Sequence, residues 1–132
     1  MGNSRILKFR AWIGKRQMIF SGDTYGAYLD FFEKCRDAHD GYGGCFLMQF
    51  TGLLDKNGKE IYEGDICQCE IADDYELEYR VEKVTITFAY GAFCPIFMAY
   101  REFCDFDDKP LRYRKFEIIG NIHENPELLR NP

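Results

Sequence analysis

The sequence lacks a long apolar run. None of its hydrophobic stretches approaches the roughly 18 consecutive apolar residues that a membrane-spanning helix requires. The first residues, MGNSRILKFRAW, also lack the continuous apolar segment of a secretion signal. We therefore expect a cytoplasmic protein that has no membrane partner.

The sequence also lacks an excess of positive charge. Its 17 Lys and Arg residues are outnumbered by 22 Asp and Glu residues, which gives a formal net charge of −5. An acidic chain does not coat duplex DNA through its overall field, because that field repels phosphates. Only a local basic patch could bind nucleic acid.

Cysteine is present, but the setting does not favour disulfides. The chain has six cysteines, namely Cys35, Cys45, Cys67, Cys69, Cys94 and Cys104. Disulfides belong to oxidising compartments and to small secreted domains, and neither applies to a chain of this size without a secretion signal. We expect reduced thiols.

What the chain does contain is apolar and aromatic side chains. Hydrophobic residues make up 46% of the sequence and aromatic residues 17%, which is far more than a disordered chain carries. A chain of 132 residues suits one domain with one core. We therefore expect a single domain over residues 1–132.

Near the start, apolar and polar residues alternate. One face of this segment carries Leu7, Phe9, Ala11 and Ile13, and the other carries Lys8, Arg10 and Trp12. A period of two predicts a half-buried strand, and the apolar residues 18–20 predict a second strand that completes a hairpin.

Spacings of three and four residues predict one helix, inserted at about residues 24–40. Its apolar positions are Tyr28, Phe31, Phe32, Cys35 and Ala38. Ser21, Asp23 and Thr24 are candidate N-caps, and Gly41 ends the pattern.

The stretch TGLLDKNGKEIYEGDIC, residues 51–67, is rich in turn signals. Asn57-Gly58 is the dipeptide that accepts positive φ at both centres of a tight hairpin turn. Gly64 permits a kink or bulge, and Asp65 can accept hydrogen bonds from nearby backbone amides. We interpret the stretch as a structural bend and not as a reaction centre.

The C-terminal half predicts a second hairpin, around residues 84–100, and a last strand over residues 113–122 in which Gly120 shares a face with apolar residues. Asn125 is expected to cap a terminal turn that begins at Pro126. The expected fold class is mainly β, a β-rich α+β chain. It is a compact bent antiparallel sheet or SH3-like small barrel with one inserted helix and a short C-terminal helical turn.

Three segments resemble a known family. KFRAW (residues 8–12), MQFTGLLDKNGKEIYEGDI (residues 48–66) and FEIIGNIHENPELL (residues 116–129) are similar, in order and spacing, to the signature blocks of the YopX family. The resemblance implies a single YopX-like domain, a small β-rich protein encoded by bacteriophages or prophages and found in the bacterial cytoplasm. It implies no catalytic residues and no cofactor.

Three constellations could carry chemistry. Asp55, Glu60, Glu63 and Asp65 could supply carboxylates for acid–base catalysis or a divalent cation. Cys67 and Cys69 share one face of a strand, where Cys94, Cys104 or His123 could complete a zinc site. His123 beside Glu124 could assist a cysteine nucleophile. Each has a competing structural explanation: turn hydrogen bonds, core packing and a polar surface turn.

The basic and aromatic run Arg112, Tyr113, Arg114, Lys115 is the candidate nucleic-acid site. We expect Lys8 and Arg10, with Trp12, Lys15 and Arg16, on neighbouring strands. Rings that stack on bases and cations that follow phosphates suit single-stranded nucleic acid. The alternative is that these charges protect an exposed strand edge.

The sequence favours a non-enzymatic interaction module that contacts an unknown protein of phage or host, with self-association left open. Its acidic segments, Asp73–Glu82 and Glu102–Asp108, would suit a basic partner. An accessory protein that binds single-stranded nucleic acid is the second hypothesis, and an enzyme ranks third. No cofactor and no metal is expected.

Overall fold

The structure is a computed structural model that describes residues 7–14, 16–40, 44–72, 78–89, 92–97 and 112–129. Side chains are described for all of these except residues 40, 89, 92–97 and 112. The chain divides into two compact units, an N-terminal unit (Met1–Leu53) and a C-terminal unit (Leu54–Pro132).

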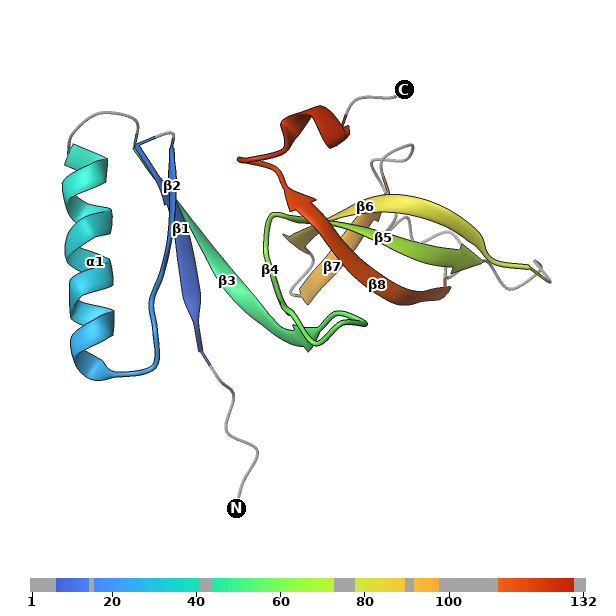
Figure 1. The fold of residues 1–132 in the computed structure, drawn as a ribbon, viewed down its shortest axis with the longest axis horizontal. Coiled ribbons are helices and arrows are strands. Elements are labelled where there is room, and N and C mark those ends of the chain that lie inside the picture. Colours follow the sequence, from blue (N-terminus) through green and yellow to red (C-terminus); the bar gives the residue numbers. More distant parts are fainter. Residues whose placement is uncertain are drawn as a thin grey trace, which may run out of the picture. The chain divides into compact units, whose positions relative to one another are not determined.

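The N-terminal unit is a small antiparallel sheet with one helix. Its elements in chain order are β1 (Phe9–Ile13), β2 (Gln17–Phe20), α1 (Tyr25–Asp40) and β3 (Cys45–Leu54). The strand order is β2-β1-β3, which makes β1 the central strand. Figure 1 shows α1 running alongside these strands. The predicted hairpin and the predicted helix at about residues 24–40 are confirmed.

The core of this unit lies between α1 and the sheet. Ala11 and Ile19 pack against Phe31 and Cys35, as the alternation in β1 and the helical spacing in α1 predict. Thr24 caps the helix, since its Oγ1 accepts a hydrogen bond from the Ala27 amide at 3.1 Å. Ser21, another candidate cap, is buried instead, and its Oγ accepts a hydrogen bond from the Phe9 amide at 3.0 Å.

The C-terminal unit contains a second antiparallel sheet, which is curled. Its elements are β4 (Glu60–Tyr62), β5 (Asp65–Ala72), β6 (Arg80–Ala89), β7 (Ala92–Phe97), β8 (Arg112–Asn121) and the 3-10 helix η1 (Pro126–Leu129). The sheet has the strand order β7-β6-β5-β8, and Figure 1 shows its strands bowing. The mainly β fold class, with one helix and a short C-terminal helical turn, is confirmed.

Alternate residues of β5 build the second core. Cys67, Cys69 and Ile71 are buried together with Val84 and Ile86 of β6. The residues between them point to the other side of the strand. Of these, Gln68 is exposed and Glu70 is half-buried. Between Cys67 and Ile71, β5 thus has a core face and an outer face, whereas both its ends are buried.

The turn before β4 differs in one detail from its prediction. Gly58 has φ +84°, but within the described residues Lys115 is the only non-glycine residue with positive φ, so Asn57 does not share this conformation. The Gly58 amide donates to the Asp55 carbonyl at 3.0 Å, and the Asp55 amide donates to the Lys59 carbonyl at 2.7 Å. This is a three-residue hairpin loop in which only glycine needs positive φ.

An asparagine side chain caps the turn between β8 and η1, and Asn125, which was predicted to cap η1, makes a different side-chain contact. Oδ1 of Asn121 accepts hydrogen bonds from the amides of His123 and Glu124, at 3.0 and 2.8 Å. Asn125 instead points back, and its Oδ1 accepts from the Asn121 amide at 3.2 Å. Pro126 begins η1 as predicted. Gly120 leaves room for Asn125, because a Cβ there would lie 2.6 Å from Asn125 Oδ1.

Candidate interaction site

The candidate basic strand is the first half of β8, where the sheet contains a β-bulge. Glu70 of β5 pairs with Arg114 and Gln68 pairs with Glu117, so Lys115 and Phe116 together oppose the single residue Cys69. Lys115 has φ +58°. This conformation is usually adopted by glycine at the first position of such a bulge.

The bulge resets the alternation of side chains along β8. Arg114 and Lys115 are both exposed although they are adjacent. Tyr113 and Phe116 pack instead against the core, with their rings stacked at 6.2 Å. Two successive cations therefore lie on one surface, while Tyr113, expected to stack on bases, is half-buried beside the core.

Glu70 holds both cations. Its Oε1 accepts a hydrogen bond from Arg114 Nε at 2.8 Å and lies 3.8 Å from Lys115 Nζ. The Arg114 hydrogen bond lowers the pKa of the Glu70 carboxyl below its usual value, and the charges of Lys115, Arg114 and Lys56 act in the same direction against a smaller opposing effect of burial.

Arg114 is held on a second side by an aromatic ring. Its guanidinium carbon lies 3.6 Å from the centroid of Tyr79, a cation–π contact. Sequence reasoning missed Tyr79, because it lies outside any strand pattern and 35 positions before Arg114. The start of β6 lies near Arg114 because both β6 and β8 pair with β5, where Glu70 is opposite Val81 on one side and Arg114 on the other.

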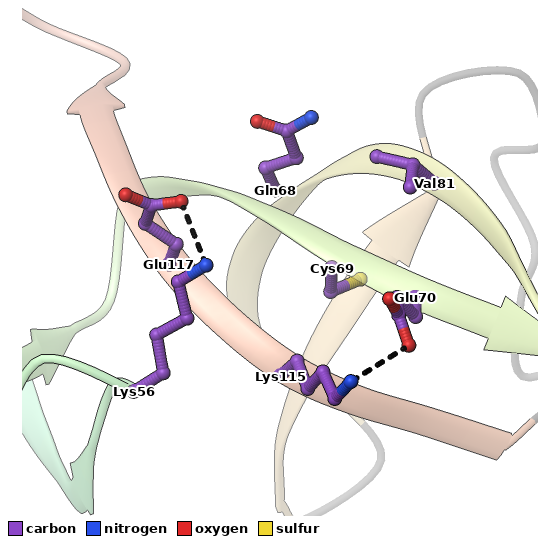
Figure 2. Close-up of a pocket in the computed structure, with 7 residues that line it drawn as sticks. All are labelled: Lys56, Gln68, Cys69, Glu70, Val81, Lys115 and Glu117. Carbon is purple, nitrogen blue, oxygen red and sulfur yellow. Dashed lines mark ion pairs between the residues drawn. The ribbon is translucent and has the colours of Figure 1, made fainter.

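A small pocket of about 160 Å³ opens beside this cluster on the C-terminal unit. Its lining residues are Lys56, Gln68, Cys69, Glu70, Val81, Lys115 and Glu117. Figure 2 shows two separate ion pairs at this pocket, Lys56–Glu117 and Lys115–Glu70. The first joins Lys56 Nζ and Glu117 Oε1 at 3.3 Å. The pocket has the size of one side chain, well below the several hundred Å³ of typical small-molecule sites.

The turn at Asp55 positions Lys56 at the pocket. Oδ1 of Asp55 accepts hydrogen bonds from the amides of Asn57 and Lys59, at 2.8 and 2.9 Å, and Oδ2 accepts one from the Ile118 amide at 3.0 Å. The Lys56 amide donates to the Phe116 carbonyl at 2.8 Å. The turn is thus tied to β8 on both sides of Glu117.

These contacts also affect the ionisation of Asp55. Burial alone would raise its pKa, but the three backbone amides and the charge of Lys59 outweigh burial, and the pKa is lowered. Asp65, the other buried carboxylate of this stretch, accepts a hydrogen bond from the Tyr62 amide at 2.7 Å. It follows Gly64, which has φ +90°. Both carboxylates bind backbone amides, which gives each a structural role.

The cysteine pair predicted as the start of a zinc site lies in the core. Burial raises the pKa of the Cys67 and Cys69 thiols to about 12 each, which disfavours the thiolate form that binds a metal. Across the part of the chain that the structure describes, no group of three or more His, Cys, Asp or Glu side chains is placed to hold a metal ion. Cys104 and the Cys94 side chain lie outside the described residues.

His123, the other candidate for chemistry, lies in the turn capped by Asn121. The acidic segments expected to bind a basic partner fall largely outside the described residues, which exclude 73–77 and 102–108. The side chain of Arg112 is likewise not described, nor is Lys15.

Lys8 and Arg10 belong to the N-terminal unit, on or next to a strand that does not pair with β8. β1 and β8 are in different sheets, so the expected neighbouring strands are not formed. Lys8 Nζ lies 3.7 Å from Asp23 Oδ1 and 5.8 Å from the Phe50 ring centroid. Arg10 is only 6% exposed, because it lies on the central strand between Phe20 and Met48. Little of the Arg10 side chain is therefore accessible to a ligand from solvent.

A second surface, on the N-terminal unit, is apolar. The side chains of Arg10 and Trp12 in β1 lie on the sheet face that points away from α1. The strand register places three apolar side chains on the same face, namely Met18 and Phe20 of β2 and Phe46 of β3. Phe20 is 57% exposed and Phe46 is 54% exposed. The two rings lie on strands on either side of β1, and exposed aromatic side chains are typical of protein-contact surfaces.

No helix among the described residues is both long and apolar enough to cross a membrane.

Comparison with known proteins finds a matching family and similar solved structures. The family described as YopX protein matches residues 8–130, which lie in both units. The chain is also similar to protein EF1440 from Enterococcus faecalis, known from a crystal structure, with 27% sequence identity and a TM-score of 0.54. That similarity covers 96% of this chain and 100% of the other. No curated protein matches.

Proposed function

The chain belongs to the YopX family, and from that premise we propose that it is a phage- or prophage-encoded interaction module that acts through protein contacts. On this proposal it is not an enzyme, and it works in the cytoplasm of the bacterial host. The phage origin rests on the family resemblance, and the protein contacts rest on the two surfaces described above.

The pairing of the β8 cations is the observation that carries the proposal. Arg114 and Lys115 both lie against Glu70, and Lys56 lies against Glu117. Phosphates approaching these cations would also approach two carboxylates, which repel them. A surface of mixed charge with a pocket for one side chain is better matched to a protein partner, where complementary charges set specificity.

The apolar surface of the N-terminal unit supports the same function. Phe20 and Phe46 each expose about half of their surface, and aromatic residues are enriched in the buried centres of protein interfaces. Burial of the exposed part of these rings by a partner would contribute hydrophobic free energy to binding.

Binding of single-stranded nucleic acid is the second candidate function. One observation favours it: the guanidinium of Arg114 lies on the Tyr79 ring, and cations with aromatic rings are the usual platform for bases and phosphates. Here Tyr79 takes the role that Tyr113 was expected to fill.

Site-specific photo-crosslinking tests the protein-contact proposal. A photoreactive amino acid replaces Val81, which is exposed and lines the pocket, and the control carries it at Glu33 on the exposed side of α1. In bacterial cells that express the protein, we expect a discrete protein adduct at position 81 and none at position 33. Equal labelling at both positions would mean that the pocket face is no specific contact surface.

Fluorescence anisotropy with labelled single- and double-stranded oligonucleotides tests the alternative. We expect no binding at low salt. Micromolar binding that weakens as salt rises, and that is lost on Arg114→Ala, would replace the protein-contact proposal with the nucleic-acid one.

A further inference from the structure

We propose that the pocket beside the β8 bulge binds an acidic side chain, an Asp or Glu on an extended segment of a protein partner, with its carboxylate between Lys56 and Lys115. The inference rests on the proposed protein-contact function and adds to it the chemistry of the partner. It reverses the sequence-based expectation of a basic partner, which relied on the acidic segments.

The cations on this surface are not fully neutralised by its carboxylates. Glu70 is shared by two cations, and Arg114 holds it at 2.8 Å while Lys115 stays at 3.8 Å. One carboxylate cannot neutralise both cations, so Lys115 carries surplus charge. Lys83 adds a further cation, because it pairs in register with Gln68 and shares its outer face. The surface is therefore locally cationic although the whole chain has a net charge of −5.

The lysines keep donors for a new acceptor. An ammonium group has three N–H donors, and the single contacts of Lys56 to Glu117 and of Lys115 to Glu70 leave room for a second carboxylate. The side chains of Lys56 and Lys115 are 49% and 61% exposed, so such an acceptor can reach them from solvent.

The size and lining of the pocket fit the rest of such a side chain. A volume of about 160 Å³ accepts one residue, and Val81 and Cys69 offer apolar surface to its methylene groups. The exposed Gln68 can donate or accept a hydrogen bond at the rim.

The backbone of β8 supports a role for Lys115 in particular. A lysine at φ +58° is strained by roughly 1 kcal/mol or more relative to glycine. Strain of this kind is often kept where a side chain is needed in a set position. The bulge turns Lys115 outward beside Arg114, so that it lines the pocket and does not enter the core.

A single-stranded nucleic acid fits less well, because its phosphates recur along the strand and would meet both Glu70 and Glu117. A single carboxylate brings only one negative charge near these two glutamates, which also line the pocket, so the repulsion is smaller than for a chain of phosphates. Nucleic acid is therefore an outcome of the test and not part of the proposal.

The test is a titration of the full-length ¹⁵N-labelled protein followed by NMR. The probes are three end-blocked seven-residue peptides, in which alanine alternates with Glu, Gln or Lys, and a hexathymidylate. We expect only the Glu peptide to shift the amides of Lys56, Gln68, Lys115 and Glu117. In the Lys56→Gln and Lys115→Gly variants its affinity should fall at least about fivefold, because a hydrogen bond to a charged group is lost.

Two controls separate binding from folding. Lys115→Gly keeps the backbone conformation that the bulge needs, so its melting temperature should not fall. Lys34→Gln removes an exposed lysine of α1, paired with Asp30, and should leave the peptide affinity unchanged.

Three other outcomes of the titration would overturn the inference, and they can be told apart. Equal shifts from the Gln or Lys peptide would keep protein contact at this pocket but remove the acidic partner. The absence of shifts from every peptide at millimolar concentration would also remove it, and the Val81 crosslinking would then decide the broader function separately. Shifts from hexathymidylate alone, lost in Lys115→Gly, would overturn both proposals.

Discussion

At the scale of single residues, Asp55 has more structural contacts than its place in a surface turn indicates. A short turn with Asn-Gly predicts a local role for the aspartate, and two of its hydrogen bonds are local. The third, from the Ile118 amide, crosses 63 positions in sequence. Asp55 therefore connects the turn to β8 through hydrogen bonds to both.

The first prediction concerns Asp55→Ala. The substitution leaves three backbone amides without their acceptor, so we expect a loss of about 2 to 4 kcal/mol in the free energy of unfolding at pH 7. Because the folded-state pKa of Asp55 is lowered from 3.8, the ionised form contributes stability above that value. The contribution is lost as the pH falls through the folded pKa.

Urea unfolding at pH 7 and at pH 3 measures this effect. The difference between wild type and Asp55→Ala should be smaller at pH 3. Asp37→Ala, at an exposed helix position, should change the unfolding free energy by no more than about 0.5 kcal/mol. A difference that does not depend on pH would show that the charge of Asp55 is unimportant.

The second prediction concerns the strained residue Lys115. Lys115→Gly relieves the positive φ and should keep or raise the unfolding free energy, by up to about 1 kcal/mol. Lys115→Val forces a β-branched residue into that conformation and should cost about 1 to 3 kcal/mol. Chemical denaturation of both variants checks this, with Arg114→Gly as the control at ordinary φ. If valine were tolerated as well as glycine, the bulge conformation would be wrong.

At the scale of elements, the junction between β8 and η1 depends on the contact of a glycine with an asparagine. Gly120 has no side chain where Asn125 Oδ1 approaches, and that oxygen accepts the Asn121 amide. Asn121 in turn caps the turn. The end of the strand and the start of the 3-10 helix are therefore fixed together.

The third prediction follows from that contact. Gly120→Ala places a Cβ within 3.0 Å of three atoms of Asn125 and should cost about 1 to 3 kcal/mol. Gly26→Ala is the matched control, because its Cβ in α1 would meet nothing within 4 Å. It should stabilise the protein by up to about 1 kcal/mol through helix propensity. Thermal unfolding of the two variants should therefore shift in opposite directions, and a fall for both would contradict the proposed contact.

The sequence predicts elements whose signals are local. The spacing from Tyr28 to Ala38 predicts α1, and the alternation in residues 9–13 predicts β1 and its inward face. The N-cap of α1 was predicted less well, because Ser21, Asp23 and Thr24 are chemically similar candidates. Only the chain path decides that Thr24 is the one that meets a helix amide.

The candidate site was only partly predictable, because its geometry depends on register. Strict alternation would put Arg114 and Lys115 on opposite faces, and no glycine marks the bulge that puts both outside. The partners Glu70 and Tyr79 come from other parts of the chain. The burial of Arg10 was not predictable for a similar reason, since its position on the central strand is a property of the sheet and not of its neighbours in sequence.

At the scale of the whole molecule, the net charge and the local charge point to different partners. A chain of net charge −5 is repelled by polyanions at long range. The cationic surface around Lys115 acts only within about a Debye length, roughly 10 Å at 0.1 M salt. A short acidic segment of a protein can satisfy both conditions, whereas a long nucleic acid meets the repulsion along its length.

The last prediction concerns the buried thiols that both units contain. Burial raises the pKa of Cys35 in the N-terminal unit, and of Cys67 and Cys69 in the C-terminal unit, to about 12 from 9.0. In the unfolded chain these thiols ionise near pH 9, while in the folded protein they stay protonated. The protein should therefore be most stable below pH 9 and lose stability steadily as the pH rises from 9 towards 12.

Urea unfolding between pH 8 and pH 11 tests this for one thiol at a time. Cys67→Ala should unfold at a lower free energy throughout, but its free energy should fall less steeply with pH than that of wild type. Val84→Ala removes a comparable buried group without an ionisable atom, so its curve should run parallel to wild type. The other ionisable groups are the same in all three proteins, so their contributions cancel in the comparison. A Cys67→Ala curve parallel to that of wild type would mean that this thiol is not protected from ionisation by the core.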